Sequence, residues 1–249
     1  MEKLDLEQLN QDFEKKSPAE IVDWAAKTFA PRFAATSSFG PESGVLLSLI
    51  GKTDPETPVL FLETGFHFPE TLEYKNQLTK MFGLKRVIDL KADPARREKL
   101  VQDYQGKPYE GNPDLCCQIN KVEPLDEALK GYSAWMSGIR RNQTDHRKSI
   151  RIVEEYEGGI YKISPLANMT SRDTWWYLKE NQIPIHPLYE KGYMSIGCWP
   201  CTRPIQDGDD ERSGRWAGKA KKECGIHTFK EVKSGKEEPE APKETGEGI

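Results

Sequence analysis

The stretch RFAATSSFGPESGVLLSLI, residues 32–50, joins an apolar strand to an apolar helix through a turn of serine, glycine and proline. A strand, a short turn and a helix in succession are the building unit of α/β proteins with a parallel sheet. Hydroxyl groups and close backbone approach are offered at this turn by Ser37, Ser38, Gly40 and Ser43. The following helix N-terminus adds free N–H groups, so the turn predicts a phosphate site, without the lysine of a Walker loop. An ordinary strand–helix turn rich in capping residues is the alternative.

Strands and helices continue to alternate on both sides of this turn. Further strands are predicted at residues 57–65, 86–90, 133–139 and 160–166. Helices are predicted near residues 4–13 and at 17–30, 68–83 and 170–182. The alternation predicts an α/β fold with a largely parallel sheet flanked by helices, in which ligands bind beyond the carboxyl ends of the strands.

The bulk composition excludes several classes of protein. The chain has 249 residues, a net charge of −4 and 36% hydrophobic residues. These values are typical of a globular protein and argue against a general affinity for nucleic acid. No apolar run is long enough to span a bilayer, and the polar N-terminus does not resemble a signal peptide. We therefore expect a cytoplasmic protein without a membrane partner, and the oligomeric state is left open, a homo-oligomer included.

Three parts are expected along the chain. Residues 1–202 should form the α/β domain that carries the ligand sites. The alternation is lost from about Gly192 onward, and residues 203–229 should form a mobile segment with a flexible C-terminal end. Residues 230–249 contain almost no apolar side chains and should be a disordered acidic tail.

Two more loops follow predicted strands and would meet the first turn at the same edge of the sheet. In LETGFHFPET, the residues Leu62, Thr64 and Gly65 would face the same crevice, which favours a nucleotide as the ligand. In SGIRRNQTDHR, the candidate contacts are Gly138, Arg140, Arg141 and Arg147. Guanidinium groups bind phosphate or sulfate through two parallel hydrogen bonds. A solvated basic loop is the alternative.

Four of the five cysteines form two pairs. Cys116 and Cys117 are adjacent in PDLCCQINKVEPL, and Cys198 stands in C-x-x-C spacing with Cys201 in YMSIGCWPCTRP. Adjacent cysteines reach relaxed disulfide geometry with difficulty, so reduced or metal-bound thiols are expected. Zinc normally uses C-x-x-C twice, whereas a vicinal pair with one C-x-x-C better fits a wider iron–sulfur cluster. A redox C-x-x-C beside incidental buried cysteines is the alternative.

The fifth cysteine, Cys224, lies in KKECGIH near the end of the chain. The cationic residues around it are Arg203, Arg212, Arg215, Lys219, Lys221, Lys222 and His227. Nearby cations favour the nucleophilic thiolate, and a thiol in this company suits attack on an anionic substrate. A free surface cysteine beside a disordered tail is the alternative.

Together these motifs resemble the assimilatory adenylyl-sulfate reductases of the phosphoadenylyl-sulfate reductase family. The most specific parts are CC with Lys121 four residues after Cys117, GCWPCTRP, ERSGRW and ECGIH. Weaker matches are SSFGPES, LETGFHFPET and GIRRNQT. The resemblance extends to about Phe229 and implies an adenine-nucleotide α-hydrolase-like α/β fold. Ile226 stands where leucine is frequent, which is a volume-conserving change.

The resemblance also implies an activity, namely the reduction of adenylyl sulfate to sulfite and AMP in sulfate assimilation and cysteine biosynthesis. Cys224 would take the sulfonate as S-sulfocysteine, and thioredoxin or glutaredoxin would release sulfite from it. The implied ligands of a [4Fe-4S] cluster are Cys116, Cys117, Cys198 and Cys201. The implied substrate-binding residues are Ser37, Ser38, Gly40, Glu42, Ser43, Leu62, Thr64, Gly65, Lys121, Gly138, Arg140, Arg147, Arg212, Arg215 and His227. The cluster would be structural and electrostatic, ordering Lys121 near the sulfate.

Other functions remain open from the sequence. The nearest alternative substrate is 3′-phosphoadenylyl sulfate, or both nucleotides. An ATP pyrophosphatase-type sulfur-transfer enzyme would share the serine-rich loop, but such enzymes use S-G-G-x-D-S, whereas this chain has Glu42 where aspartate would stand. A non-enzymatic metal-binding or redox-sensing module would not need Cys224 and its basic surroundings.

Overall fold

The computed structural model describes residues 3–156, 158–206, 209–219 and 221–226. A six-stranded sheet with the order β3-β2-β1-β4-β6-β5 forms its centre. The strands are β1 (Phe33–Thr36), β2 (Val59–Leu62), β3 (Val87–Leu90), β4 (Ala134–Ser137), β5 (Val153–Tyr156) and β6 (Ile160–Ile163). Neighbouring strands are parallel except for β5 and β6. The predicted α/β fold with a largely parallel sheet is confirmed.

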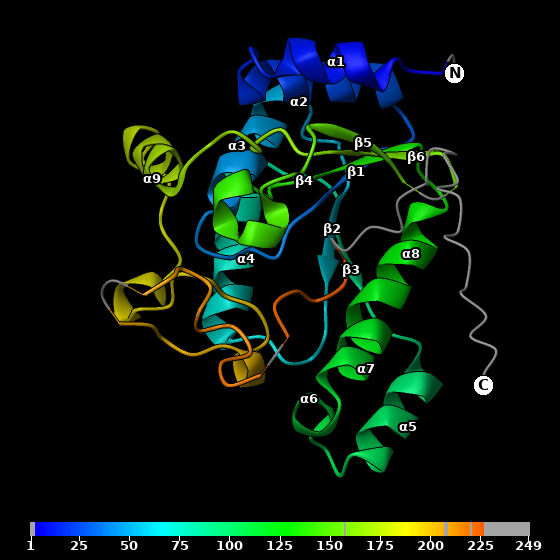
Figure 1. Cartoon of the computed structure of the whole chain (residues 1–249), viewed down its shortest axis with the longest axis vertical. Helices are drawn as coiled ribbons and strands as arrows, with labels where there is room; N and C mark the ends of the chain where they lie inside the picture. The colour runs from blue at the N-terminus through cyan, green and yellow to red at the C-terminus, as the bar shows by residue number, and fades with distance from the viewer. Residues whose placement is uncertain (1–2, 157, 207–208, 220, 227–249) are drawn as a thin grey trace, which may run out of the picture.

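Helices lie on both faces of this sheet (Figure 1). The α-helices are α1 (Leu6–Phe13), α2 (Pro18–Phe29), α3 (Ser43–Thr53), α4 (Pro69–Met81), α5 (Pro94–Asp103), α6 (Pro108–Gly111), α7 (Pro113–Cys117), α8 (Glu123–Leu129) and α9 (Ser171–Glu180). Short helical turns are η1 (Gln118–Val122), η2 (Arg141–Gln143), η3 (Asp145–Arg147), η4 (Tyr189–Lys191) and η5 (Trp199–Cys201). Figure 1 shows α5, α6, α7 and α8 grouped together, apart from α3 and α4.

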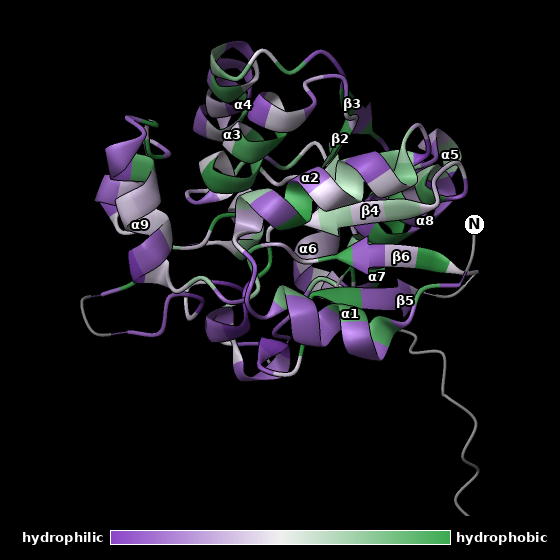
Figure 2. Ribbon diagram, turned by 90° about the horizontal axis from the view of Figure 1, so that it is seen from above, coloured by the Kyte–Doolittle hydropathy of each residue, from purple (hydrophilic) through white to green (hydrophobic). Residues whose placement is uncertain are grey.

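The alternation of side chains along each strand builds two separate apolar cores. On β1, Phe33 and Ala35 belong to the larger core, which also contains buried residues of α2, α3, α4 and α9. Ala34 points to the opposite face, where it shares a smaller core with Trp135 of β4 and Leu125 of α8. Successive strand residues face opposite sides of a sheet, so both faces of this sheet require cover. Figure 2 shows a strongly apolar stretch on α3, whereas α1 and α9 are mostly hydrophilic.

Local sequence signals account for most of the element boundaries. Ser17 and Glu20 form the capping box that starts α2, with Pro18 at its first position, as the sequence predicts. Each predicted strand and helix is present, and β5 and the helices α5 to α8 are additional. No helix among the described residues is long and apolar enough to cross a membrane. The predicted tail, residues 230–249, lies outside the described residues.

Candidate active site

A cavity of about 200 Å³ opens beyond the carboxyl ends of β1, β2 and β4. The turn between β1 and α3 forms one of its walls through Ser37, Ser38, Gly40, Glu42 and Ser43. The N-cap of α3 is Glu42, and no side chain caps the helix, although the amides of Ser43 and Val45 donate to the carbonyls of Gly40 and Glu42. A helix N-terminus at the edge of a parallel sheet is a ready-made anion site.

Most of the sequence-predicted contacts surround this cavity. Besides the turn, the predicted residues that line it are Leu62, Lys121, Gly138, Arg147, Arg212, Arg215 and Cys224. Three predicted contacts, Thr64, Gly65 and Arg140, are not part of its wall. His227 lies outside the described residues.

The strand end at β2 explains why Thr64 and Gly65 leave the cavity. The chain turns sharply after Leu62, and Gly65 is an exposed residue with a φ of 73°. A side chain at Gly65 would meet Arg97, because a Cβ there would lie 2.1 Å from Nη2 of that residue. Thr64 is buried instead against Cys198, with 3.3 Å between its Oγ1 and the Sγ. The expectation of one shared crevice therefore holds only for Leu62.

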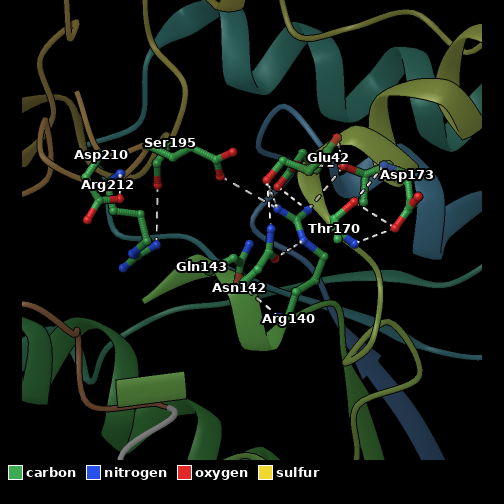
Figure 3. Close-up of polar contacts among 12 residues, drawn as sticks. Glu42, Arg140, Asn142, Gln143, Thr170, Asp173, Ser195, Asp210 and Arg212 are labelled. Carbon is green, nitrogen blue, oxygen red and sulfur yellow. Dashed lines mark hydrogen bonds and ion pairs between the residues drawn. The ribbon is translucent and has the colours of Figure 1, made fainter. Parts of the chain in front are cut away.

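Arg140 is held by carboxylates behind the β1–α3 turn (Figure 3). Its side chain is 1% exposed and its Nη1 lies 2.5 Å from Glu42, with Glu211 at 3.7 Å from Nη2. Its guanidinium also donates to hydroxyl groups of Ser171 and Thr174. The expected oxyanion contact is thus replaced by an internal one, since a buried guanidinium requires a counter-charge. We call the turn residues 37–43 together with Arg140 the turn side of the cavity.

Cys224 lies on another wall, beside a buried ion-pair network. Arg147 donates from Nε and Nη2 to the two carboxylate oxygens of Glu223, each at 2.8 Å. Arg212 lies 3.3 Å from the same carboxylate. Arg212 also donates to Oγ of Ser195 at 3.3 Å (Figure 3). Burial raises the pKa of Glu223, but the hydrogen bonds from Arg147 and the charge of Arg212 lower it by more, so the carboxylate stays ionised.

Two cations near Cys224 have no carboxylate partner within the described ranges. Arg215 packs its guanidinium over the ring of Trp216, 4.5 Å from the centroid, and lies against Gly197. Lys121 is partly buried and contacts no carboxylate. Burial lowers the pKa of Lys121, but interaction with the neighbouring cysteines, Cys198 foremost, raises it by more. We call Lys121, Arg212, Arg215, Glu223 and Cys224 the thiol side of the cavity.

A second, smaller cavity brings the four paired cysteines together. Its wall contains Cys116, Cys117, Cys198 and Cys201 together with Thr64, Phe66, Tyr109, Pro113, Asn120, Lys121 and Trp216. All of the cysteines are free, and burial raises the pKa of Cys116 to about 12 and that of Cys117 to about 11. Lys121 lines both cavities, so it connects the cysteine group with the space beside Cys224.

The vicinal pair and Lys121 are placed by one interrupted helix. α7 ends at Cys117, the π-helical turn η1 follows at Gln118–Val122, and α8 continues from Glu123. Asn120 in this turn donates from its side chain to the carbonyl of Cys116 at 2.9 Å and to its Sγ at 3.8 Å. Single π-turns within helices are frequent at functional sites, because they redirect side chains without ending the helix.

No group of three or more His, Cys, Asp or Glu side chains converges on a single-ion site within the part of the chain that the structure describes. The four paired cysteines line one cavity without meeting at one point. A mononuclear zinc site, the other metal site considered from the sequence, would require such convergence.

Known proteins share the part of the chain that forms most of these two cavities. The model of the phosphoadenosine phosphosulfate reductase domain matches residues 32–204. The chain belongs to the phosphoadenosine phosphosulfate reductase family. The matched range begins next to β1 and ends just after the second cysteine pair. It includes most of the residues that line the two cavities and leaves out those between Glu211 and Ile226.

Curated relatives in this family carry two different names. A protein of Halalkalibacterium halodurans named adenosine 5′-phosphosulfate reductase is 39% identical over 225 residues, which is 90% of this chain and 97% of the relative. A protein of Gloeobacter violaceus named phosphoadenosine 5′-phosphosulfate reductase is 42% identical over 227 residues, with 89% and 93% coverage. The chain is therefore similar over nearly its full length to reductases named for either sulfonucleotide.

Solved structures agree with the family assignment and with the fold. Phosphoadenylyl-sulfate reductase from Candida auris, in a phosphate complex, is similar with a TM-score of 0.68 and 29% identity, covering 80% of this chain and 98% of that one. FMN adenylyltransferase from Candida glabrata, with FAD and pyrophosphate, has a TM-score of 0.57 and 16% identity, covering 82% and 69%. The second likeness shows the fold alone, the adenine-nucleotide α-hydrolase-like α/β sandwich.

Several cavity residues of this reductase-family chain escaped sequence reasoning. Among them are Phe61, His67, Gln143, Met194 and Trp216. Trp216 belongs to ERSGRW and is 3% exposed, which gives its neighbour Arg215 a fixed surface to lie on. Glu223 was missed as well, although its position beside Cys224 and its lone negative charge among cations were visible in the sequence.

Proposed function

We propose that the protein reduces adenylyl sulfate to sulfite and AMP, with Cys224 as the nucleophile. One observation carries this proposal: Cys224 shares a cavity with the N-terminus of α3, which no side chain caps, and with two cations that lack carboxylate partners among the described residues, Lys121 and Arg215. A phosphosulfate anhydride needs contacts of both kinds, since it carries negative charge beside a nucleoside.

The first stage is a transfer of the sulfonate group to the thiolate of Cys224. The sulfur of the thiolate attacks the sulfur of adenylyl sulfate, so an S–S bond forms while the bond to the bridging oxygen breaks. AMP leaves with the electron pair of that bond, and S-sulfocysteine remains on the chain. Lys121 and Arg215 would stabilise the sulfonate oxygens and the charge that develops on the leaving phosphate.

The second stage discharges the adduct through a dithiol protein such as thioredoxin or glutaredoxin. One thiolate of the dithiol attacks the sulfur of Cys224, and sulfite leaves with the electron pair of the broken S–S bond. The second thiol of the same partner resolves the mixed disulfide and regenerates the thiol of Cys224. The partner is oxidised by two electrons, which balances the reduction of the sulfonate to sulfite. Such chemistry belongs to a reducing compartment, which supports a cytoplasmic location.

The four paired cysteines fit a [4Fe-4S] cluster better than any single ion. The donors are all sulfur, they are free and mostly buried, and they line one cavity without converging on one point. A cluster binds each of its cysteines through a different iron, so convergence is not required. We propose Cys116, Cys117, Cys198 and Cys201 as its ligands. When bound, the cluster would supply a fixed electrostatic environment for Lys121, while the thiol chemistry proceeds on Cys224.

The alternative substrate is 3′-phosphoadenylyl sulfate. Similarity to relatives with both names leaves this choice to the site itself. The cavity wall contains the carboxylates of Glu42, on the turn side, and of Glu211, and the single guanidinium of Arg140 offsets only one of these two charges. These carboxylates favour the nucleotide with fewer negative charges, because like charges in a partly dehydrated site repel each other. Adenylyl sulfate is therefore the preferred substrate.

Two assays test the proposal directly. Sulfite release should be measured with each nucleotide in the presence of reduced thioredoxin, and adenylyl sulfate should be the better substrate. Without the reductant, the chain should gain a mass of about 80 Da, as expected for one transferred sulfonate group on the nucleophile. Digestion should locate this gain on the peptide that contains Cys224. An adduct on Cys198 or Cys201, or no adduct at all, contradicts the mechanism.

Metal analysis tests the cluster separately. Protein purified without oxygen should be brown and contain about four irons per chain, as a four-cysteine cluster requires. Cys117→Ser should lose the iron, whereas Cys224→Ser should keep it, which makes these two cysteine variants a matched pair. A colourless protein with one zinc would contradict the cluster assignment.

A further inference from the structure

The residue that precedes the nucleophile is the most enclosed acid of the cavity wall. The side chain of Glu223 is 5% exposed, and it faces two arginines rather than solvent. The mechanism proposed above gives this carboxylate no part in bond making. A buried carboxylate is expensive to desolvate, so its position requires an explanation.

Glu223 is bound in a geometry that fixes its orientation. Arg147 comes from the loop after β4 and grips both carboxylate oxygens at 2.8 Å, with only 6% of its own side chain exposed. Arg212 adds a contact at 3.3 Å and also donates to the carbonyl of Lys222 at 3.4 Å. A bidentate arginine–carboxylate pair defines direction as well as distance, unlike a single point contact. The ion pair therefore sets where the next residue along the chain can lie.

Few other contacts hold this part of the chain against the domain. Residues 221–224 form no helix or strand, and no backbone-to-backbone hydrogen bond joins them to the described parts of the molecule. Lys221, whose own side chain is 10% exposed, pairs with Asp114, whose side chain is 80% exposed, so solvent screens the carboxylate of this pair. Ile226 packs on the smaller core two residues beyond the nucleophile. Among the ion pairs that residues 221–224 make within the described part of the chain, that of Glu223 with Arg147 is the one in which both side chains are most enclosed.

We infer that Glu223 is a positioning residue that docks Cys224 at the cavity through Arg147 and Arg212. This inference rests on the proposed role of Cys224 as the nucleophile. Arg147 makes the bidentate contact to Glu223, whereas Arg212 makes one contact to it and also lines the cavity beside Lys121 and Arg215. The single carboxylate of Glu223 offsets only one of the two guanidinium charges, so the docked Arg147–Glu223–Arg212 group still presents positive charge to the cavity.

The test compares Glu223→Gln with Glu14→Gln in the cluster-containing protein. Glu14 makes a bidentate pair with Arg141, which lies in the same loop after β4 as Arg147, and both contacts are 3.0 Å or less. Glu14 is not part of the cavity wall. Three quantities are measured: the single-turnover rate of adduct formation without reductant, the Kd of AMP, and the alkylation rate of Cys224 by iodoacetamide, read from its peptide mass.

Glu223→Gln should slow adduct formation by roughly ten- to a hundredfold, as expected when a buried charge pair is broken. The Kd of AMP should stay the same or fall, because two arginines are released. Alkylation of Cys224 should become faster by about tenfold, since the thiol leaves its docked position. Glu223→Asp should restore part of the adduct rate, and Glu14→Gln should match the wild type in all three measurements.

The outcomes separate the inference from the proposed function. If the wild type forms no adduct on Cys224, the proposed function fails, whatever the variants do. If the wild type forms the adduct and Glu223→Gln forms it equally fast with unchanged alkylation, the positioning role is wrong. If the Kd of AMP rises by the same factor as the rate falls, Glu223 and its two arginines maintain the whole nucleotide site and do not specifically position Cys224. That result also overturns the inference.

Discussion

The turn side and the thiol side of the cavity treat positive charge in opposite ways. On the turn side, Arg140 is fully enclosed and paired with Glu42 and Glu211, so it contributes no net charge to a ligand. On the thiol side, Lys121 and Arg215 keep their charge without a carboxylate partner among the described residues. The sequence shows arginine on both sides, and only the pairing in three dimensions tells them apart.

This difference indicates how the cavity orients its ligand. Hydroxyls and apolar side chains on the turn side suit the nucleoside, while the N-terminus of α3 can meet its phosphate. The uncompensated cations on the thiol side attract its anionic end toward Cys224. Orientation therefore depends on which cations are already paired, rather than on how many cations surround the cavity.

The largest expected effect separates chemistry from binding on the thiol side. Cys224→Ser should lower sulfite release by more than about a thousandfold, because removal of a nucleophile abolishes the covalent route. The Kd of AMP should be unchanged, since neither charged partner of the ligand is altered. Steady-state assays and calorimetric titration check the two quantities. Sulfite production above that level, or a lost affinity for AMP, would place Cys224 in binding rather than in catalysis.

The second prediction concerns the turn side, where pairing should matter for stability. Glu42→Ala leaves Arg140 partly uncompensated in a buried position and should lower the free energy of unfolding by about 3 kcal/mol. Urea denaturation measures this loss. Glu14→Ala, which breaks a largely exposed arginine pair, is the control and should lower it by less than about 1 kcal/mol. Equal losses in the two variants would mean that the Arg140 pair is no more structural than a surface pair.

The third prediction concerns the unpaired cations. Lys121→Met and Arg215→Met should each weaken nucleotide binding by about 1.5–3 kcal/mol, the worth of a charge-assisted hydrogen bond. Stability should change little, because neither residue satisfies a carboxylate within the described ranges. Binding of adenylyl sulfate to the Cys224→Ser background gives the affinities without turnover. Lys85→Met, at an exposed lysine away from the cavity, is the control. Wild-type affinity in both variants would show that the unpaired cations of the thiol side do not bind the nucleotide.

The fourth prediction places acid sensitivity in the scaffold, outside both sides of the cavity. His186 is 1% exposed; its Nδ1 accepts from the amide of Leu188, so its Nε2 donates to Thr71, and burial lowers its pKa to about 4 from an ordinary 6.5. The folded state then binds fewer protons than the unfolded state between these values. Stability is complete above pH 6.5 and is lost as the pH falls toward 4, by roughly 2 kcal/mol at pH 5 from this residue.

Urea denaturation at pH 5 and pH 8 measures the effect of His186. The difference between the two pH values should shrink in His186→Gln and persist in Lys121→Met. If the Lys121 variant flattens the pH dependence instead, the thiol side is the acid-sensitive region.

The smallest expected effect concerns the position of the Arg215 guanidinium against Gly197. A Cβ at Gly197 would lie 2.2 Å from Nη2 of Arg215, so Gly197→Ala must displace the guanidinium. The flexible side chain yields more easily than the backbone, and the substrate KM should rise about three- to tenfold with little loss of stability. Gly131→Ala, whose nearest contact would be an ordinary 3.6 Å, is the control. An unchanged KM would mean that Arg215 binds no substrate from this position.

The sequence predicts those parts of the molecule that depend on local order. The strand–turn–helix at residues 32–50 and the capping box at Ser17 follow from neighbouring residues, and both are present. The sequence does not predict strand β5, because its residues are mostly polar. The short glycine turn that joins β5 to β6 also lies in this polar stretch. The pairing of Glu223 with Arg147 joins residues that are 76 positions apart, which no local pattern reveals. For the same reason, the roles of Arg140 and Lys121 could not be distinguished.

The π-helical turn η1 has a consequence for how this protein tolerates insertions and deletions. It lies between Cys117 and α8, and Lys121 is one of its residues. Loss of a single residue here would restore a regular α-helix and rotate everything before it by about 100° relative to α8. The vicinal cysteines and the lysine would then face different directions, although every residue type was retained. Insertions and deletions in this region should therefore occur in the surface loops. The seven residues from Cys116 to Val122 should keep a constant length.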